Sequence, residues 1–214
     1  MSKNIYPVNR RLEGLRRDKM TYKAQNYDHL LGTDGFSDTL LRNHFTLYQG
    51  YVTNTNKVAE LLKVLATNDK TTAPEYAELK RRFGWEFNGM RLHEYYFGNM
   101  SKEDSEFNAD SKFGKKLASE FGSFKAWKSD FKGSGAIRGI GWVILAYDKQ
   151  GDRLFNLWVN EHDLGHLAAA QPLLVMDVFE HAFMLDYGLK RADYIEAFFK
   201  AVDWDEVTKR FDKS

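Results

Sequence analysis

The chain has 214 residues, 43% of them hydrophobic, so it can bury the core of one large domain or of two small, closely joined ones. Its formal net charge of +1 argues against a nucleic-acid-binding protein, because duplex binders usually carry an overall basic charge. The absence of cysteine excludes disulfides and thiolate chemistry, so any metal site must use histidine and carboxylate ligands. No apolar run approaches the roughly 20 residues of a membrane span, and the N-terminus lacks an apolar signal core. We therefore expect a cytoplasmic protein that binds neither membrane nor nucleic acid.

The first part of the chain is basic and then helical. Residues 1–25 carry arginines and lysines with little hydrophobic period and are expected to form a basic N-terminal arm. Apolar residues recur at helical spacing over 37–65, a helix whose first residue, a serine, can act as N-cap. A second helix is predicted over 72–84, beginning at a threonine cap and ending at a glycine, and a third over about 85–96.

The second part of the chain contains the predicted strands. Residues 141–158 read as two β-strands joined by a turn at 150–152, and residues 172–176 as a third strand. Short helices are expected twice within 101–132, over 192–202 and over 205–211. Helices followed by a small antiparallel sheet and further helices predict an α+β fold, with a helical N-terminal half and an α+β C-terminal half.

Charged residues follow the third strand directly. Asp177 ends its apolar run, and Glu180 and His181 come just behind it. Charged groups beside a buried strand are normally paired or bound to a metal, because removing them from water alone costs several kcal/mol or more. This segment therefore indicates a functional site.

Two other histidines lie on the apolar faces of predicted helices. His44 belongs to the first helix and His93 to the third, and each taken alone is more often a core residue than a ligand. His29 lies in an irregular polar segment and is expected at the surface. Together with Asp177 and His181, the two helical histidines would supply three nitrogens and one oxygen, a set that suits iron or manganese.

From about residue 22 to residue 210 the chain resembles the iron/manganese superoxide dismutases. The resemblance is carried by residues 177–183 followed by 185–187 and 191–198, by 37–44 followed by 51–56, and by 89–97 with Asn99. It implies that His44, His93, Asp177 and His181 hold one Fe or Mn ion per subunit, with solvent as a fifth ligand. Superoxide would then be converted to dioxygen and hydrogen peroxide by alternate oxidation and reduction of that ion.

The resemblance also implies an architecture. It implies an N-terminal helical hairpin domain over 26–100, followed by a C-terminal domain over 101–214 with a three-stranded antiparallel sheet and flanking helices. The assembly would be a homodimer or a higher homo-oligomer. The competing hypothesis is a homologue that binds metal without dismutating superoxide, as a metal store or structural subunit. A non-haem iron oxygenase agrees less well, because it would normally use two histidines and one carboxylate.

The chain departs from the commonest family pattern beside the metal. Where many members have a glutamine bonded to the solvent ligand, this chain has His162, as some members do. An imidazole N–H can donate to bound hydroxide as an amide does, but its other nitrogen then needs a partner. His166, four residues on, is either that partner or a surface residue. The alternative for His162 is an ordinary polar loop residue.

A second departure concerns the gateway to the metal, where the family has a histidine and a tyrosine after the first ligand. Here Tyr48 and Tyr51 follow His44 at i+4 and i+7, which is one face of an unbroken α-helix. We assign Tyr51 as the gateway phenol, with Tyr48 in place of the usual histidine. The competing assignment makes Tyr48 the gateway and Tyr51 a core residue.

Further positions around the site follow from the resemblance. Glu180 resembles the glutamate that reaches the partner subunit's ligand histidine, the kind of carboxylate that orients ligating imidazoles. Met184 stands where the family commonly has an interface tyrosine, and Phe179 where it commonly has a tryptophan. Trp142 is expected to wall the metal pocket or to belong to the sheet core. Arg191 is expected to help attract a small anion.

Overall fold

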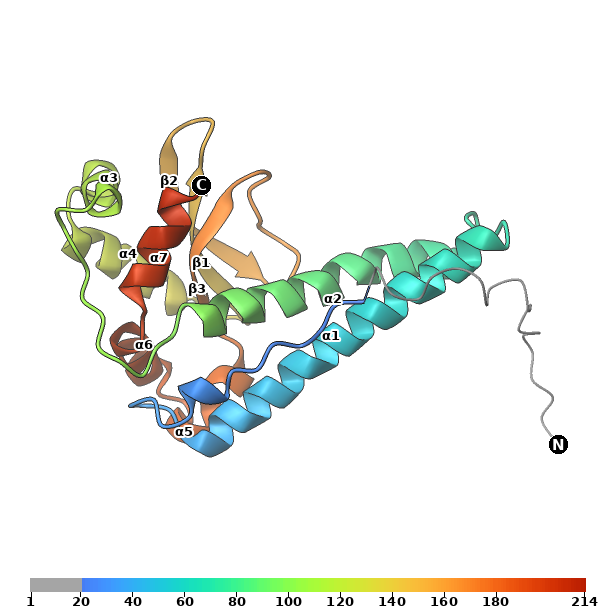
Figure 1. Ribbon diagram of the computed structural model, residues 1–214, viewed down its shortest axis with the longest axis horizontal. Helices are drawn as coiled ribbons and strands as arrows, with labels where there is room; N and C mark the ends of the chain where they lie inside the picture. Colours follow the sequence, from blue (N-terminus) through green and yellow to red (C-terminus); the bar gives the residue numbers. More distant parts are fainter. Residues whose placement is uncertain (1–20) are drawn as a thin grey trace.

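A long helical hairpin forms the N-terminal half of the protein. The computed structural model describes residues 21–214, so residues 1–20 of the predicted basic arm lie outside the described residues. Helix α1 (Asp38–Thr67) begins where Ser37 accepts the N–H of Leu40 on its side chain, and α2 (Pro74–Gly98) returns along it. The loop that joins the two helices lies at the end of the hairpin that points away from the sheet (Figure 1).

Helix α2 corrects two sequence-based expectations. The two helices predicted over 72–84 and 85–96 are one continuous helix, because a single Gly84 costs only about 1 kcal/mol relative to alanine and does not end the hydrogen-bond ladder. The predicted threonine cap is also wrong: the N-cap is Ala73, whose side chain makes no capping bond. Pro74 occupies the first turn, where its missing N–H is of no consequence.

The C-terminal half is built on an antiparallel sheet. Strands β1 (Gly141–Asp148), β2 (Arg153–Asn160) and β3 (Gln171–Asp177) pair in the order β2-β1-β3, so β1 is central. Its pairing places Trp142 opposite Val159 on one side and opposite Asp177 on the other. The α+β class, the strand hairpin and the third strand are therefore confirmed.

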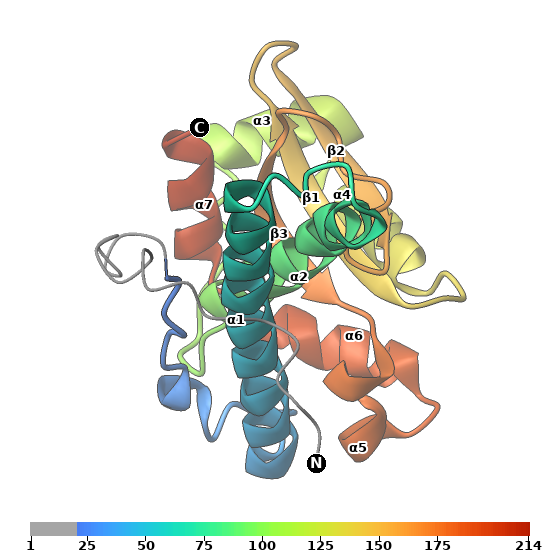
Figure 2. The ribbon, with the colours of Figure 1, turned by 90° about the vertical axis from the view of Figure 1, so that its right-hand side faces the viewer.

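The remaining described helices are short. They are α3 (Lys112–Phe121), α4 (Phe124–Gly135), α6 (Arg191–Lys200) and α7 (Trp204–Asp212), with the single-turn η2 (Asp28–Leu30), η3 (Glu180–Ala182) and α5 (Met184–Tyr187). The α1–α2 hairpin runs past the sheet, and the turned view shows α1 in front with the sheet behind it (Figure 2). Helices α2 and α7 contact β3, whereas α4 contacts β1 and β2. Among the described helices, none combines the length and hydropathy that crossing a bilayer requires.

The two halves share one hydrophobic core. The same cluster of buried side chains includes Leu41 of α1, Tyr96 of α2, Trp142 of β1 and Phe198 of α6. Buried Asn99, just after α2, exchanges two hydrogen bonds with the backbone of Val175 in β3, at 2.8 and 3.2 Å. The end of the hairpin is thus locked to the strand that ends at Asp177. The predicted division at residue 100 stays a prediction.

Candidate metal centre

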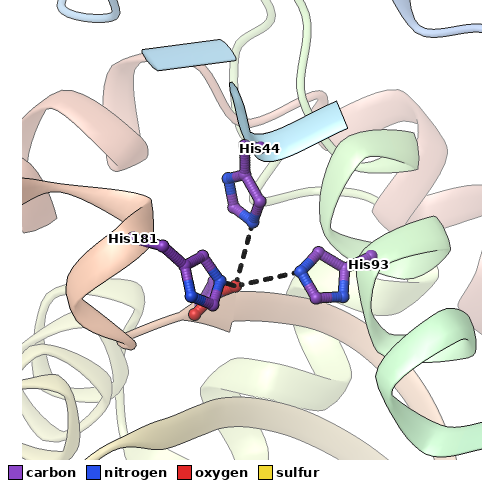
Figure 3. A group of neighbouring side chains, drawn as sticks. His44, His93 and His181 are labelled. Atoms are coloured by element: carbon purple, nitrogen blue, oxygen red, sulfur yellow. Dashed lines mark hydrogen bonds and ion pairs between the residues drawn. The ribbon is translucent and has the colours of Figure 1, made fainter. Parts of the chain in front are cut away.

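Four elements bring one potential ligand each to a single point. His44 comes from α1, His93 from α2, Asp177 from the end of β3 and His181 from η3. The three imidazoles point toward one another, and the dashed lines meet at one carboxylate oxygen (Figure 3). Their ligand atoms all lie within 4.8 Å of one another. Ligand atoms about 2 Å from one ion lie up to about 4 Å apart, so the cluster has nearly the size of a mononuclear site.

One oxygen of Asp177 is the centre of this cluster. Its Oδ2 lies 3.2 Å from Nε2 of His44, 3.6 Å from Nε2 of His93 and 3.1 Å from Nε2 of His181. Its Oδ1 accepts the backbone N–H of Phe179 at 2.8 Å, and its backbone carbonyl accepts the hydroxyl of Tyr194 at 2.6 Å. The carboxylate is therefore held in place by groups other than the imidazoles.

The hydrogen bond of His93 shows that these residues fit a cation. Its Nδ1 lies 2.5 Å from the backbone carbonyl of Gly89, which can only accept, so the ring proton is on Nδ1. The lone pair on Nε2 then faces the carboxylate oxygen of Asp177 at 3.6 Å, and two acceptors repel unless a cation lies between them. Among the described residues, His93 Nε2 is a buried nitrogen without a hydrogen-bond partner. The donor set of three imidazoles and one carboxylate suits Fe or Mn.

The pKa shifts within the cluster favour the protonation states that bind a metal. Burial lowers the pKa of His44 and, further, that of His93, so both rings are neutral near pH 7. Burial by itself raises the pKa of Asp177, but His181 and His44 outweigh it and hold that pKa well below its usual range. Metals bind neutral imidazole and ionised carboxylate, the forms that these pKa shifts favour for His44, His93 and Asp177.

A hydrogen-bonded trio lies against this cluster. The ring of Tyr51 stacks on His93 with centroids 5.2 Å apart, and the indole of Trp142 meets His93 edge-on at 4.9 Å. Tyr51 Oη lies 2.8 Å from Nε2 of His162, and Trp142 Nε1 donates to Nδ1 of His162 at 3.0 Å. Burial raises the pKa of Tyr51 well above its usual value, so the phenol keeps its proton. The trio thus forms a polar wall beside His93.

The two candidate gateway tyrosines have different partners. The hydroxyl of Tyr48 donates to Glu94 Oε1 and accepts the backbone N–H of Gln25, both at 3.0 Å. The hydroxyl of Tyr51 instead lies 2.8 Å from Nε2 of His162. Tyr48 thus ties the backbone of Gln25 to α1, and the assignment of Tyr51 as the gateway phenol stays a prediction.

Gly89 is a residue whose role the sequence alone does not reveal. A Cβ at this position would lie 2.5 Å from Cδ1 and 2.7 Å from Cε1 of Tyr51, so only glycine leaves room for the ring. Its carbonyl also orients His93. The signal in the sequence is a glycine inside a helical pattern, four residues before a histidine on the same face.

The remaining predicted residues lie further out. His166 donates to the backbone carbonyl of His162 at 2.9 Å and does not contact its ring nitrogens, whose partners are Trp142 and Tyr51. The guanidinium of Arg191 donates to the carbonyls of Ile137 and Gly139 at 2.7 and 2.8 Å, so it joins α6 to the segment before β1. Its role in attracting an anion stays a prediction. Glu180 and His29 are exposed.

Comparisons with known proteins point to one family. The family model described as "Iron/manganese superoxide dismutases, C-terminal domain" matches residues 109–210. Superoxide dismutase [Mn] 2 of Haloferax volcanii is 35% identical over 80% of this chain and 84% of its own length. Superoxide dismutase [Fe] of Aquifex aeolicus is 35% identical over 90% of this chain and 93% of its own. The chain therefore belongs to the iron/manganese superoxide dismutase family.

Proposed function

We propose that the chain is a superoxide dismutase that binds one Fe or Mn ion per subunit through His44, His93, Asp177 and His181. Relatives that are 31–35% identical are named superoxide dismutase [Fe] or [Mn], which supports the activity over a metal store or structural subunit. The observation that carries the ligand assignment is the buried lone pair of His93 facing Asp177, because that pair needs a cation between its members.

The reaction converts two superoxide anions and two protons to one dioxygen and one hydrogen peroxide. The bound ion supplies the redox couple that takes an electron from one superoxide and gives it to the next. Tyr51 supplies protons and His162 orients it, since the two side chains are within hydrogen-bonding distance and the Tyr51 ring stacks on His93. Trp142 and Phe179 pack around His162 and exclude water from it.

A homodimer completes this proposal. Glu180 is exposed directly beside His181, and exposed apolar side chains follow it in Met184, Leu185 and Leu189, which are 43, 58 and 92% exposed. Apolar side chains beside a metal ligand are suited to burial against a second copy of the chain, whose ligand histidine Glu180 would then orient. A cytoplasmic location stays part of the proposal.

The decisive experiment is metal analysis combined with an activity assay. The purified protein is loaded separately with iron and with manganese, and dismutation is measured for each form; we expect about one ion per subunit and activity with at least one metal. A fully metallated protein that is inactive with both metals would instead be a metal-binding homologue. Asp177→Asn should lose the ion, whereas Asp163→Asn, at an exposed carboxylate, should keep it. If Asp177→Asn binds metal as well as the wild type, the ligand assignment is wrong.

The assembly is tested separately by light scattering after gel filtration. We expect a dimer or a larger oligomer for the wild type, and weaker association for Leu185→Glu, which places a charge on the exposed apolar surface. A monomer at every concentration would refute the dimer without affecting the ligand assignment.

A further inference from the structure

His162 is enclosed by aromatic rings and by two polar partners. Its side chain is fully buried, stacks on Phe179 with centroids 4.9 Å apart, and meets the ring of Trp85 edge-on at 4.5 Å. Its two ring nitrogens have separate partners, Trp142 at Nδ1 and Tyr51 at Nε2. The imidazole therefore cannot rotate without losing both hydrogen bonds.

The partner at Nδ1 decides where the ring proton is. An indole N–H can only donate, so Nδ1 of His162 must accept the bond from Trp142 and carries no proton. In the opposite tautomer, two N–H groups would face each other at 3.0 Å inside the protein. Burial also lowers the pKa of His162 to about 4, so the ring has a single proton near pH 7. That proton is on Nε2, 2.8 Å from the oxygen of Tyr51.

We propose that Trp142 is a positioning residue that selects the Nε2–H tautomer of His162, so that His162 donates its one ring proton to Tyr51 and Tyr51 presents its hydroxyl proton to the substrate. The hydrogen bonds then run in one direction, from Trp142 through His162 to Tyr51. Within residues 21–214 the hydroxyl of Tyr51 has no other protein partner, so its proton is free to be donated outward.

This inference rests on the proposed function. It also shows how a histidine at position 162 differs from the glutamine that many family members have there. A glutamine amide has two N–H groups and can donate to two acceptors at once, whereas a neutral imidazole has one. With its proton directed at Tyr51, His162 has none left for a second acceptor. Of the three residues in the trio, Tyr51 is then the one that supplies a proton to superoxide-derived oxygen.

The tautomer is measured by NMR on the full chain labelled with nitrogen-15 in histidine. The protein is loaded with gallium(III), a diamagnetic trivalent ion, because iron and manganese would broaden the signals, and the His162 signals are assigned by their loss in His162→Gln. We expect an unprotonated Nδ1 and a protonated Nε2. A protonated Nδ1 in the wild type would overturn the proposal, and this measurement needs no variant to fold.

Three variants separate the effect of Trp142 on the His162 ring from the effects of Tyr51 and of packing. In Trp142→Phe we expect both tautomers in comparable amounts; a pure Nε2–H form would overturn the proposal. In Tyr51→Phe the Nε2–H tautomer should persist, because the indole still donates to Nδ1; a change of tautomer there would assign the control to Tyr51 instead. Trp85→Phe is the matched control, since that indole also packs on His162 but donates to Glu161. An equal loss of the tautomer in Trp85→Phe would assign the effect to packing.

The functional consequence is measured on the iron and manganese forms. Trp142→Phe should lower dismutation about 10-fold or more toward the level of Tyr51→Phe, and the double variant should be no worse than Tyr51→Phe alone. If the losses of activity from the two substitutions added up in the double variant, Trp142 would not act through Tyr51, and the proposal would be overturned. A wild-type protein that is inactive with both metals would refute the proposed function but would leave the NMR result interpretable.

Discussion

The close approach of Gly89 and Tyr51 makes Gly89→Ala an informative substitution. The added Cβ would lie 2.5 Å from Cδ1 of Tyr51, whereas ordinary contacts begin at 3.4 Å, so the ring has to move by about 1 Å. The hydrogen bond from His162 to Tyr51 is 2.8 Å long, so a displacement of this size away from His162 would take the two atoms beyond hydrogen-bonding distance. The substitution therefore separates Tyr51 from His162 without changing either residue.

Three energies decide the effect of Gly89→Ala on stability. Alanine stabilises the interior of a helix by about 1 kcal/mol relative to glycine. The overlap with the Tyr51 ring costs about 1–3 kcal/mol, as additions to a packed interior usually do, and the lost hydrogen bond costs about 1 kcal/mol. We expect a net destabilisation of about 1–3 kcal/mol, which lowers Tm by about 2–4 °C for each kcal/mol in a chain of this size.

The matched control is Gly84→Ala in the same helix. Among the described residues, no heavy atom lies within 4 Å of a Cβ built at position 84 beyond the helix's own backbone and neighbours, so only the helix preference remains. This variant should gain up to about 1 kcal/mol and keep its activity. Thermal denaturation and dismutation assays compare the two. If Gly89→Ala were as stable and as active as Gly84→Ala, Tyr51 would not depend on the space at Gly89.

Three further predictions concern metal, pH and the other tyrosine. Removing the ion with a chelator should lower Tm, since a ligand at 1,000 times its Kd stabilises the folded state by about 4 kcal/mol; the Tm of Asp177→Asn should not respond. Burial lowers the pKa of His162 to about 4, whereas in the unfolded chain the same ring binds a proton below about pH 6.5. The free energy of unfolding should therefore fall as the pH drops from about 6.5 to about 4. Urea titrations measure the free energy of unfolding at each pH, and His162→Gln should reduce its dependence on pH by about 1.4 kcal/mol per pH unit in this range. An unchanged pH dependence would mean that His162 is protonated in the folded protein. Tyr48→Phe removes the hydroxyl that bonds to Glu94 and to the backbone N–H of Gln25, and it should lower the free energy of unfolding by about 1–3 kcal/mol. The control is Tyr147→Phe, which removes an exposed hydrogen bond and should change the free energy of unfolding by less than about 0.5 kcal/mol.

Local patterns in the sequence were sufficient for most of the elements. The serine at position 37 does cap α1, and the two strands predicted on either side of the turn at 150–152 do form a hairpin. Both signals act over a few neighbouring residues, so they need no knowledge of the rest of the chain. The break predicted at Gly84 failed because packing of the apolar face of α2 outweighs the modest cost of one glycine.

The sequence by itself determined the α+β order of elements, an acid at the end of a buried strand and, through a family resemblance, the four residues proposed as ligands. Only the tertiary structure decided which groups face one another: Trp142 and Tyr51 on either side of His162, and the Tyr51 ring over Gly89. The partners in the hydrogen bond between Tyr51 and His162 are 111 residues apart in the chain. Their distance depends on how α1, α2 and the sheet pack, and no periodicity or local preference specifies that packing.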